Sequence, residues 1–275
     1  MQLIHTVSEL RSCLVSEKPV AFVPTMGNLH EGHVALVRQA REYGSYVVAS
    51  IFVNPLQFGP HEDFDQYPRT LEADCAKLQG LADVVFAPSV AEMYPEKQTI
   101  FIELPPIANE LCGAARPGHF RGMATVVLKL LNLVQPQVVL FGKKDYQQLH
   151  IIKLMAGQFN LPVEIVGGET VRAPDGLALS SRNQYLTASE RTEAAYLYQT
   201  LDDIRAGIQA GSTDFQALER EAVAGLAQRG WQVEYVSVRN QANLGLPQGE
   251  ERDWVVLAAA RLGATRLIDN LEIGL

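Results

Sequence analysis

The sequence contains few cysteines and no long apolar run. Cys13, Cys75 and Cys112 lie far apart and form no C-x-x-C pair, which argues against a disulfide framework and against a zinc site. We interpret them as reduced packing residues. No stretch approaches the ~18 uncharged apolar residues of a membrane-spanning helix, and the segment from Met1 to Arg11 lacks the basic and apolar regions of a signal peptide. We therefore expect a cytoplasmic protein.

Positive charge is also scarce. The 275 residues include 23 Lys and Arg against 31 Asp and Glu, which gives a formal net charge of −8. This balance repels phosphate backbones and anionic lipids, so we expect neither nucleic acid nor a membrane as a partner. Hydrophobic residues make up 47% of the chain and charged residues 20%. This composition is ordinary for a globular protein, and the length suffices for about two domains.

Up to about Gly167, short apolar runs alternate with amphipathic stretches. Five runs rich in Val, Ile and Phe have the length and composition of strands buried on both faces: Ala21–Thr25, Tyr46–Val53, Val84–Ala87, Val138–Phe141 and Val163–Val166. The stretches between them predict helices at Val34–Tyr43, Thr70–Leu81, Met123–Val134 and Asp145–Phe159. This alternation predicts an α/β fold, a Rossmann-like, doubly wound parallel sheet over residues 1–170, with ligands at the carboxyl ends of the strands.

The pattern changes after about residue 170. All seven lysines lie before this point, whereas ten of the sixteen arginines lie after it. Thr187-Ala-Ser-Glu190 is a capping box that predicts the start of a helix, and Trp231–Arg239 and Trp254–Ala260 have the pattern of strands. We predict a smaller C-terminal α+β domain over residues 171–275.

The first candidate site is Pro24-Thr-Met-Gly-Asn-Leu-His-Glu-Gly-His33, where a predicted strand passes into a helix. His30 and His33 lie one turn apart at the positive end of that helix. H-x-G-H at the end of a first parallel strand is typical of nucleotidyltransferases, in which imidazole donors stabilise an α-phosphate under attack. The alternative is that the histidines only cap the helix and that Gly32 only permits tight packing. The first turn contains no G-x-G-x-x-G, and the chain contains no Walker-type P-loop.

Two basic clusters are further candidates. In Phe141-Gly-Lys-Lys-Asp145, Lys144 offers an ammonium group to a phosphate and Gly142 permits close backbone approach. Leu179-Ser-Ser-Arg182 places hydroxyl groups and a guanidinium in a turn that could fold over a triphosphate. The plainer alternatives are a solvated lysine pair and an ordinary polar turn.

A fourth cluster carries no charge. Asn54-Pro-Leu-Gln-Phe-Gly59 follows the second predicted strand and places the amides of Asn54 and Gln57 beside the first cluster. Amides donate to a carboxylate and accept from hydroxyl or ammonium groups, so they suit a hydroxy acid and an amine. The alternative is a proline-directed turn with capping amides.

These segments together resemble the pantothenate synthetase family, from about Pro24 to Asn270. The matching motifs are PTMGNLHEGH, FVNPLQFG, YPRT, RPGHFRG, VVLKLLN, FGKKDYQQL, DGLALSSRNQYL and AARLGATRLIDN. The resemblance implies an ATP-dependent, AMP-forming ligase that condenses (R)-pantoate with β-alanine through a pantoyl adenylate, giving pantothenate and pyrophosphate in coenzyme A biosynthesis. It also implies Mg²⁺ with ATP and a homodimer.

The same resemblance implies the site residues. His33 would be the proton-donating histidine, with His30 beside it on the phosphates, and Lys144 and Arg182 would carry the positive charge. The implied ATP site comprises Met26, Gly27, Asn28, Leu29, His30, Glu31, Gly32, His33, Gly142, Lys143, Lys144, Asp145, Val171, Leu179, Ser180, Ser181 and Arg182.

For the other ligands, Gln57 and Gln148 would hold pantoate, and Gln57 would also meet β-alanine. Asn54 is a further candidate for substrate binding, and Asp74 is the candidate Mg²⁺ ligand because Mg²⁺ usually takes only one or two carboxylates beyond phosphate and water. Lys143 departs from the family pattern, where we expect an acidic or neutral residue, and Asn28 occupies a position where alanine is also common.

The implied mechanism has two steps. The carboxyl oxygen of pantoate attacks the α-phosphate, and the amine of β-alanine then attacks the acyl carbon so that AMP leaves. The acyl adenylate is hydrolysed by water, so the C-terminal domain is expected to act as a lid over the domain that binds ATP and pantoate.

Three other functions fit the sequence less well. An adenylyltransferase with a phosphate acceptor needs a basic pocket, where this chain has Asn54 and Gln57. A synthetase for transfer RNA needs a basic RNA-binding domain. A nucleotide-binding regulator without turnover needs a damaged site, whereas both histidines, Lys144 and Arg182 are present.

Overall fold

The computed structural model describes residues 1–14, 19–60, 62, 64–248 and 252–274, and the chain divides into two compact units. The first unit comprises Met1–Lys143 and Gln148–Glu169, and the second comprises Lys144–Gln147 and Thr170–Leu275. Each unit has a sheet and a hydrophobic core of its own. None of the helices formed by the described residues is long and apolar enough to cross a membrane.

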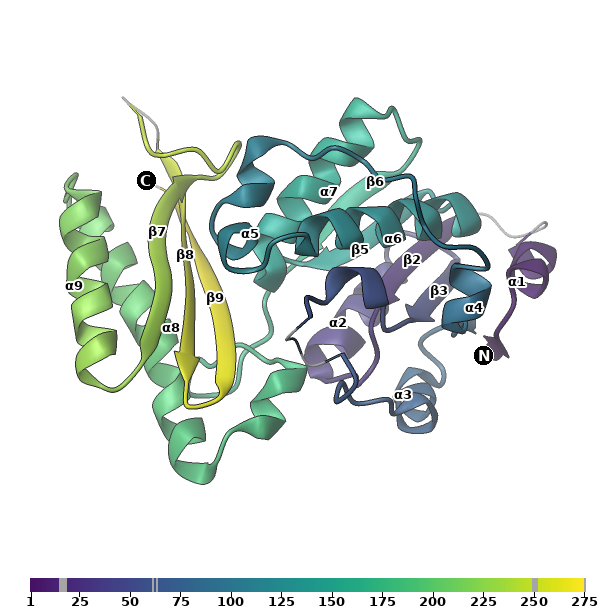
Figure 1. Ribbon diagram of the computed structural model, residues 1–275, viewed down its shortest axis with the longest axis horizontal. Helices are drawn as coiled ribbons and strands as arrows, with labels where there is room; N and C mark the ends of the chain where they lie inside the picture. The colour runs from purple at the N-terminus through teal and green to yellow at the C-terminus, as the bar shows by residue number, and fades with distance from the viewer. Residues whose placement is uncertain (15–18, 61, 63, 249–251, 275) are drawn as a thin grey trace. The chain divides into compact units, whose positions relative to one another are not determined.

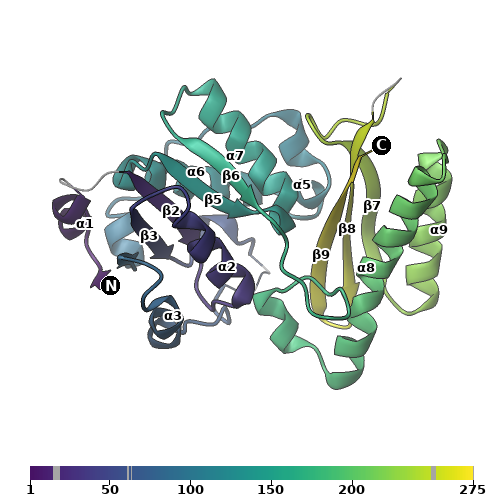
Figure 2. The ribbon, with the colours of Figure 1, turned by 180° about the vertical axis from the view of Figure 1, so that it is seen from behind.

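The first unit is a six-stranded parallel sheet with helices on both faces (Figure 1 and Figure 2). Its strands, in spatial order, are β1 (Gln2–Ile4), β4 (Val84–Phe86), β3 (Tyr46–Ile51), β2 (Val20–Thr25), β5 (Val138–Gly142) and β6 (Glu164–Gly168). The strand order reverses between β2 and β5, which confirms the doubly wound prediction and makes the carboxyl ends of these two strands the expected ligand site.

The helices along this part of the chain connect the strands. They are α1 (Val7–Leu14), α2 (Glu31–Ala40), α3 (Leu71–Leu78), α4 (Val90–Met93), α5 (Cys112–Ala115), α6 (His119–Val134) and α7 (Tyr146–Gln158), with the 3-10 helices η1 (Pro55–Gln57), η2 (Pro106–Asn109) and η3 (Lys143–Asp145). The four predicted helices correspond to α2, α3, α6 and α7. Helix α2 begins three residues before the predicted start because His30 caps it.

The five predicted strands correspond to β2 to β6, because strands covered on both faces consist of unbroken apolar runs. In β2 the residues from Val20 to Val23 are all buried. The sequence did not predict β1, which has three residues of which only Ile4 is buried, too few to produce a periodic signal.

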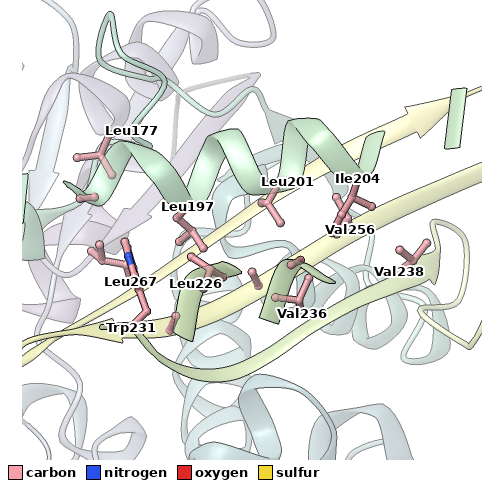
Figure 3. Packing of buried hydrophobic residues seen from close by; sticks show 14 of the residues in the cluster. Leu177, Leu197, Leu201, Ile204, Leu226, Trp231, Val236, Val238, Val256 and Leu267 are labelled. Carbon is pink, nitrogen blue, oxygen red and sulfur yellow. The ribbon is translucent and has the colours of Figure 1, made fainter. Parts of the chain in front are cut away.

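The second unit packs two long helices on an antiparallel sheet with strand order β7-β8-β9. Its elements are η4 (Ser181–Tyr185), α8 (Ala188–Gln209), α9 (Phe215–Gln228), β7 (Gln232–Asn240), β8 (Asp253–Leu262) and β9 (Thr265–Gly274). Leu197 and Leu201 of α8 and Leu226 of α9 lie in one core with Val236 and Val256 of the sheet (Figure 3).

Two details of this unit bear on the predictions. The capping box at the start of α8 is confirmed, since Glu190 N donates to Thr187 Oγ1 and Thr187 N donates to a Glu190 carboxylate oxygen. Strand β9 was not predicted, because Asp269 and Asn270 place polar side chains in the middle of it. Both are buried, at 4% and 5% exposure, so their polarity concealed a core strand.

Helix α6 approaches η1 so closely that only glycine fits at position 122. A Cβ atom on Gly122 would lie 1.9 Å from the carbonyl oxygen of Leu56 and 2.7 Å from the backbone nitrogen of Gln57. Both neighbours are backbone atoms, so they cannot rotate away. The position of η1 therefore depends on the absence of a side chain in α6.

We predict that Gly122→Ala lowers the free energy of unfolding by about 2 kcal/mol or more, because the added methyl group displaces the backbone of η1. Denaturant unfolding measures this change. The matched control is Gly157→Ala in α7, where an added Cβ meets nothing within 4 Å. Its effect should lie between neutral and about 1 kcal/mol of stabilisation, from helix propensity. Equal stability of the two variants would contradict the close contact.

Candidate active site

The carboxyl end of β2 leads into a left-handed turn. Gly27 and Asn28 have φ angles of +84° and +50°. A Cβ on Gly27 would lie 3.0 Å from Ile51 Cγ2 and 3.2 Å from Asp74 Oδ2, so the turn needs glycine for its conformation and for space. Thr25 supports the same turn, because its Oγ1 donates to Ser50 O at 2.7 Å and accepts from Gly27 N at 3.2 Å.

A buried carboxylate accepts hydrogen bonds from the backbone of this turn. Asp74, in α3, has no exposed surface, and its two oxygens accept from Asn28 N at 2.9 Å and Leu29 N at 2.8 Å. Thr70 Oγ1 donates to it as well, at 3.1 Å. Three donors compensate for the burial of the charge. Asp74 therefore anchors the segment that precedes α2.

This environment bears on the prediction that Asp74 ligates Mg²⁺, which stays a prediction. Asp74 is fully buried and its oxygens accept three hydrogen bonds, so in this structure the side chain holds the turn. Across the residues that the structure describes, no group of three or more His, Cys, Asp or Glu side chains could hold a metal ion, so at most one or two carboxylates would reach the ion.

The two histidines form a reciprocal cap at the start of α2. His30 Nδ1 accepts from Gly32 N at 3.1 Å, and His33 Nδ1 accepts from His30 N at 3.3 Å. The ring centroids lie 4.0 Å apart. An Nδ1 atom that accepts a hydrogen bond carries no proton, so each neutral imidazole carries its proton on Nε2. Capping the helix and donating to a phosphate are thus compatible, because the caps use the Nδ1 atoms and the Nε2–H groups are donors.

Asn54, at the start of η1, is 1% exposed, and protein groups saturate its amide. Its Nδ2 donates to Gln57 Oε1 and to Gly122 O, both at 3.1 Å. Its Oδ1 accepts from Leu56 N at 3.3 Å and from Tyr94 Oη at 2.8 Å. Burial raises the pKa of Tyr94, which keeps this hydroxyl a donor. Asn54 therefore orients Gln57 in this structure, and its contact with substrate stays a prediction.

Gln57 presents the donor end of its amide. Since its Oε1 accepts from Asn54, its NH₂ group points the other way, where Nε2 lies 2.9 Å from Met26 Sδ. A thioether sulfur is a weak acceptor, so a carboxylate or hydroxyl oxygen is a better partner for this NH₂ group. Gln57 is itself 7% exposed. The structure thus directs an uncharged donor toward the segment that leads to the two histidines.

The carboxyl end of β5 lies beside that of β2, because the two strands are parallel neighbours. Gly142 ends β5, and Lys143 follows it. Lys143 Nζ pairs with Glu169 Oε1 at 2.6 Å, although the Glu169 side chain is 82% exposed. Glu169 thus supplies a negative charge beside Lys143, the residue that departs from the family pattern. Gln148 lies in the first turns of α7 and is half-buried.

The remaining predicted ATP residues belong to the second unit. Val171 O accepts from Leu179 N at 2.9 Å, and Ser180 Oγ caps η4 by accepting from Arg182 N at 3.2 Å. Lys144 and Asp145 belong to the same unit, and Asn270 Nδ2 of β9 donates to Lys144 O at 2.9 Å.

The residues that hold these segments were not predicted from the sequence. Asp269 accepts a bidentate pair of hydrogen bonds from Arg172, at 2.6 and 2.9 Å, and the adjacent Asn270 holds Lys144. Neighbouring residues of β9 thereby tie both predicted ATP segments to one strand. The sequence did carry a signal for Asp269 and Asn270, because these two polar residues interrupt an apolar run in the LIDN motif.

Comparison with known proteins identifies the family. The family model described as Pantoate-beta-alanine ligase matches residues 2–272. The chain belongs to the pantoate-beta-alanine ligase family. The pantothenate synthetase of Nitrosospira multiformis is 58% identical over 275 residues, which cover 99% of this chain and 98% of that protein. The pantothenate synthetase of Neisseria meningitidis serogroup C is 56% identical over 278 residues, which cover all of this chain and all of that protein.

Solved structures of pantoate-beta-alanine ligases have the same fold. The pantothenate synthetase of Thermus thermophilus superposes with a TM-score of 0.95 at 45% identity over all of both chains. The ligase of Francisella tularensis, solved with beta-gamma ATP and beta-alanine, has a TM-score of 0.81 at 35% identity, covering 98% of this chain and 97% of that one. The family and the α/β fold expected from the sequence are confirmed.

We predict that Asp74→Asn lowers the free energy of unfolding by about 2–3 kcal/mol, because the new NH₂ group faces a backbone N–H that loses its acceptor. If Asp74 only holds the turn, the Mg²⁺ concentration for half-maximal activity should stay within about twofold of the wild-type value. Glu72→Gln, an exposed change in the same helix, is the control and should alter stability by less than about 0.5 kcal/mol. A raised Mg²⁺ requirement at unchanged stability would identify Asp74 as a metal ligand.

Proposed function

We propose that this protein condenses pantoate with β-alanine through a pantoyl adenylate and releases AMP and pyrophosphate. Family membership and the ATP and beta-alanine in the Francisella tularensis structure support this proposal. The observation that carries it is the combination, in one unit, of two Nε2–H imidazoles at a helix start with the uncharged NH₂ donor of Gln57. The first suits a phosphate under attack and the second suits a hydroxy acid.

The first step makes the carboxyl carbon reactive. A carboxylate does not acylate an amine, because its leaving group would be oxide. Its oxygen therefore attacks the α-phosphorus, and the bond between the α- and β-phosphates breaks. His30 and His33 donate through Nε2–H to oxygens that gain negative charge, with His33 as the proton donor. Lys144 and Arg182 neutralise the phosphates.

The second step uses β-alanine. Its neutral amine attacks the acyl carbon, and AMP leaves with one of the original carboxyl oxygens. Gln57 and Gln148 orient pantoate, and Gln57 also contacts β-alanine. We assign the second unit the role of a lid that excludes water from the acyl adenylate, since it carries Lys144 and Arg182.

Mg²⁺ would accompany ATP, with Asp74 as the predicted ligand, and it would supply positive charge beside the phosphates. The homodimer that the resemblance implies and the cytoplasmic location that we expect from the sequence stay predictions. Light scattering on the purified protein measures the oligomeric state.

We predict that pantoate labelled with ¹⁸O in its carboxylate transfers one label to AMP, because the oxygen that attacks phosphorus later leaves with it. ATP and pantoate alone should exchange labelled pyrophosphate into ATP, since the adenylate forms before the amine is needed. Lys144→Ala should reduce this exchange and the overall reaction together. Mass spectrometry of the nucleotide product measures whether AMP carries the label. Formation of ADP, or of AMP without label, would contradict the mechanism.

We predict that His33→Asn lowers turnover by about 10²–10³, the usual effect of removing one donor to developing charge. Asparagine retains an oxygen that can accept from His30 N but lacks the Nε2–H group, so the melting temperature should change by only a few degrees. His5→Asn, the same change outside the turn between β2 and α2, is the control and should keep turnover within about twofold. Half-normal turnover in His33→Asn would refute the assigned role.

A further inference from the structure

A chain of hydrogen bonds through Glu62, Arg116 and His119 reaches the backbone carbonyl of Gln57. The mechanism proposed above gives no role to these three residues of the first unit. Arg116 Nε and Nη2 donate to the two carboxylate oxygens of Glu62, each at 2.6 Å. The third nitrogen of the same guanidinium, Nη1, lies 3.0 Å from His119 Nε2. On the other side of this ring, His119 Nδ1 lies 2.8 Å from Gln57 O.

The two ends of this chain determine the protonation of His119. A guanidinium only donates, so His119 Nε2 accepts and carries no proton. A carbonyl oxygen only accepts, so His119 Nδ1 carries the proton. The neutral Nδ1–H tautomer is therefore the one that satisfies both neighbours. His30 and His33 have the opposite tautomer, because their Nδ1 atoms accept.

The ion pair at the outer end is partly shielded from solvent. The side chains of Arg116 and Glu62 are 16% and 25% exposed. Burial opposes ionisation of Glu62, but the hydrogen bonds and charge of Arg116 outweigh it and hold the pKa of this carboxyl below its usual value. A shielded bidentate pair fixes the guanidinium more firmly than an exposed pair does. Arg116 is thereby oriented toward His119.

The contacts around Gln57 explain why its carbonyl matters. Asn54 holds the side-chain oxygen of Gln57, and Gly122 of α6 packs against its backbone nitrogen. His119, the first residue of α6, holds the carbonyl of the same residue. A hydrogen bond to the side chain alone would let the side chain move with the backbone. The NH₂ group of Gln57 therefore keeps one direction only if the backbone of Gln57 is held as well.

We propose that Glu62, Arg116 and His119 are positioning residues that hold the Gln57 amide for pantoate and β-alanine. The proposal rests on the proposed function for the identity of these substrates. Glu62 lies five residues after Gln57 in the chain, so its pair with Arg116 also fastens the segment that contains Gln57 to the start of α6. His119 acts on the substrates through Gln57 and lies outside the ATP segments assigned above.

Two substitutions of His119 separate its two bonds. The amide nitrogen of asparagine lies where Nδ1 of histidine lies, so His119→Asn retains a donor to Gln57 O. The amide oxygen of glutamine lies near the place of Nε2, so His119→Gln retains an acceptor for Arg116 but loses the donor. We expect His119→Gln to raise the KM for pantoate and for β-alanine about tenfold, and His119→Asn to raise them less than about threefold. The KM for ATP should stay within about twofold in both, which shows that they are folded. Equal effects of the two variants on pantoate would overturn the proposal.

A second measurement tests whether His119 and Arg116 act through Gln57. In a Gln57→Ala background, His119→Gln should raise the KM for pantoate by less than about twofold, since the group that it positions is gone. Arg116→Gln should raise this KM in the wild-type background. Arg229→Gln, which breaks a similar bidentate pair with Glu193 in the second unit, should not. Full additivity of His119→Gln and Gln57→Ala would contradict the relay.

The tautomer gives a readout that needs no substrate. Nitrogen NMR of ¹⁵N-histidine protein, with His119 assigned from the missing signals of His119→Asn, should show its proton on Nδ1, and Arg116→Gln should shift the Nε2 signal. A proton on Nε2 in the wild type would overturn the relay whatever the reaction is. Failure of the wild type to form pantothenate would overturn the proposed function and leave the tautomer result intact, so the two failures are distinguishable.

Discussion

The site in the first unit depends on one buried carboxylate. Asp74 accepts the backbone N–H groups of Asn28 and Leu29, which face inward because Gly27 and Asn28 adopt left-handed conformations. Without an acceptor, each of these backbone donors would cost about 1–3 kcal/mol. The turn determines where α2 begins, and the start of α2 determines where both imidazoles lie. The charge of Asp74 is compensated behind the turn, so the positive end of α2 remains for an anion.

The segment around Gln57, which we propose to contact the acid, is held by a different principle. The Tyr94 hydroxyl donates to Asn54, and the Asn54 amide donates to Gln57, so this network consists of neutral groups. Neutral amides have distinct acceptor and donor ends, so the network decides which end of Gln57 the protein holds. A charged side chain thus holds the turn before α2, and neutral side chains hold η1.

The local patterns predicted the elements that carry the chemistry. Strands β2 to β6 were predicted because helices on both faces require unbroken apolar runs, and the capping box at Thr187 marked the start of α8. Strand β9 was missed because Asp269 and Asn270 are polar and buried at once. The hydrogen bonds that bury Asp74 and Asn54 were not predicted because their partners lie far away in sequence: Leu29 is 45 residues from Asp74, and Gly122 is 68 residues from Asn54.

The sequence by itself determined the fold class, the family and the residue types at the site, since these follow from spacings within one turn, one strand or one motif. Only the tertiary structure decided which polar side chains are saturated by protein groups. The physical reason is that a polar side chain has few hydrogen-bonding positions, and whether they are already occupied depends on groups that meet only when the chain folds. Asn54 and Gln57 share one short motif, and folding gives the Asn54 amide four protein partners, whereas the NH₂ group of Gln57 meets a weak acceptor, Met26 Sδ.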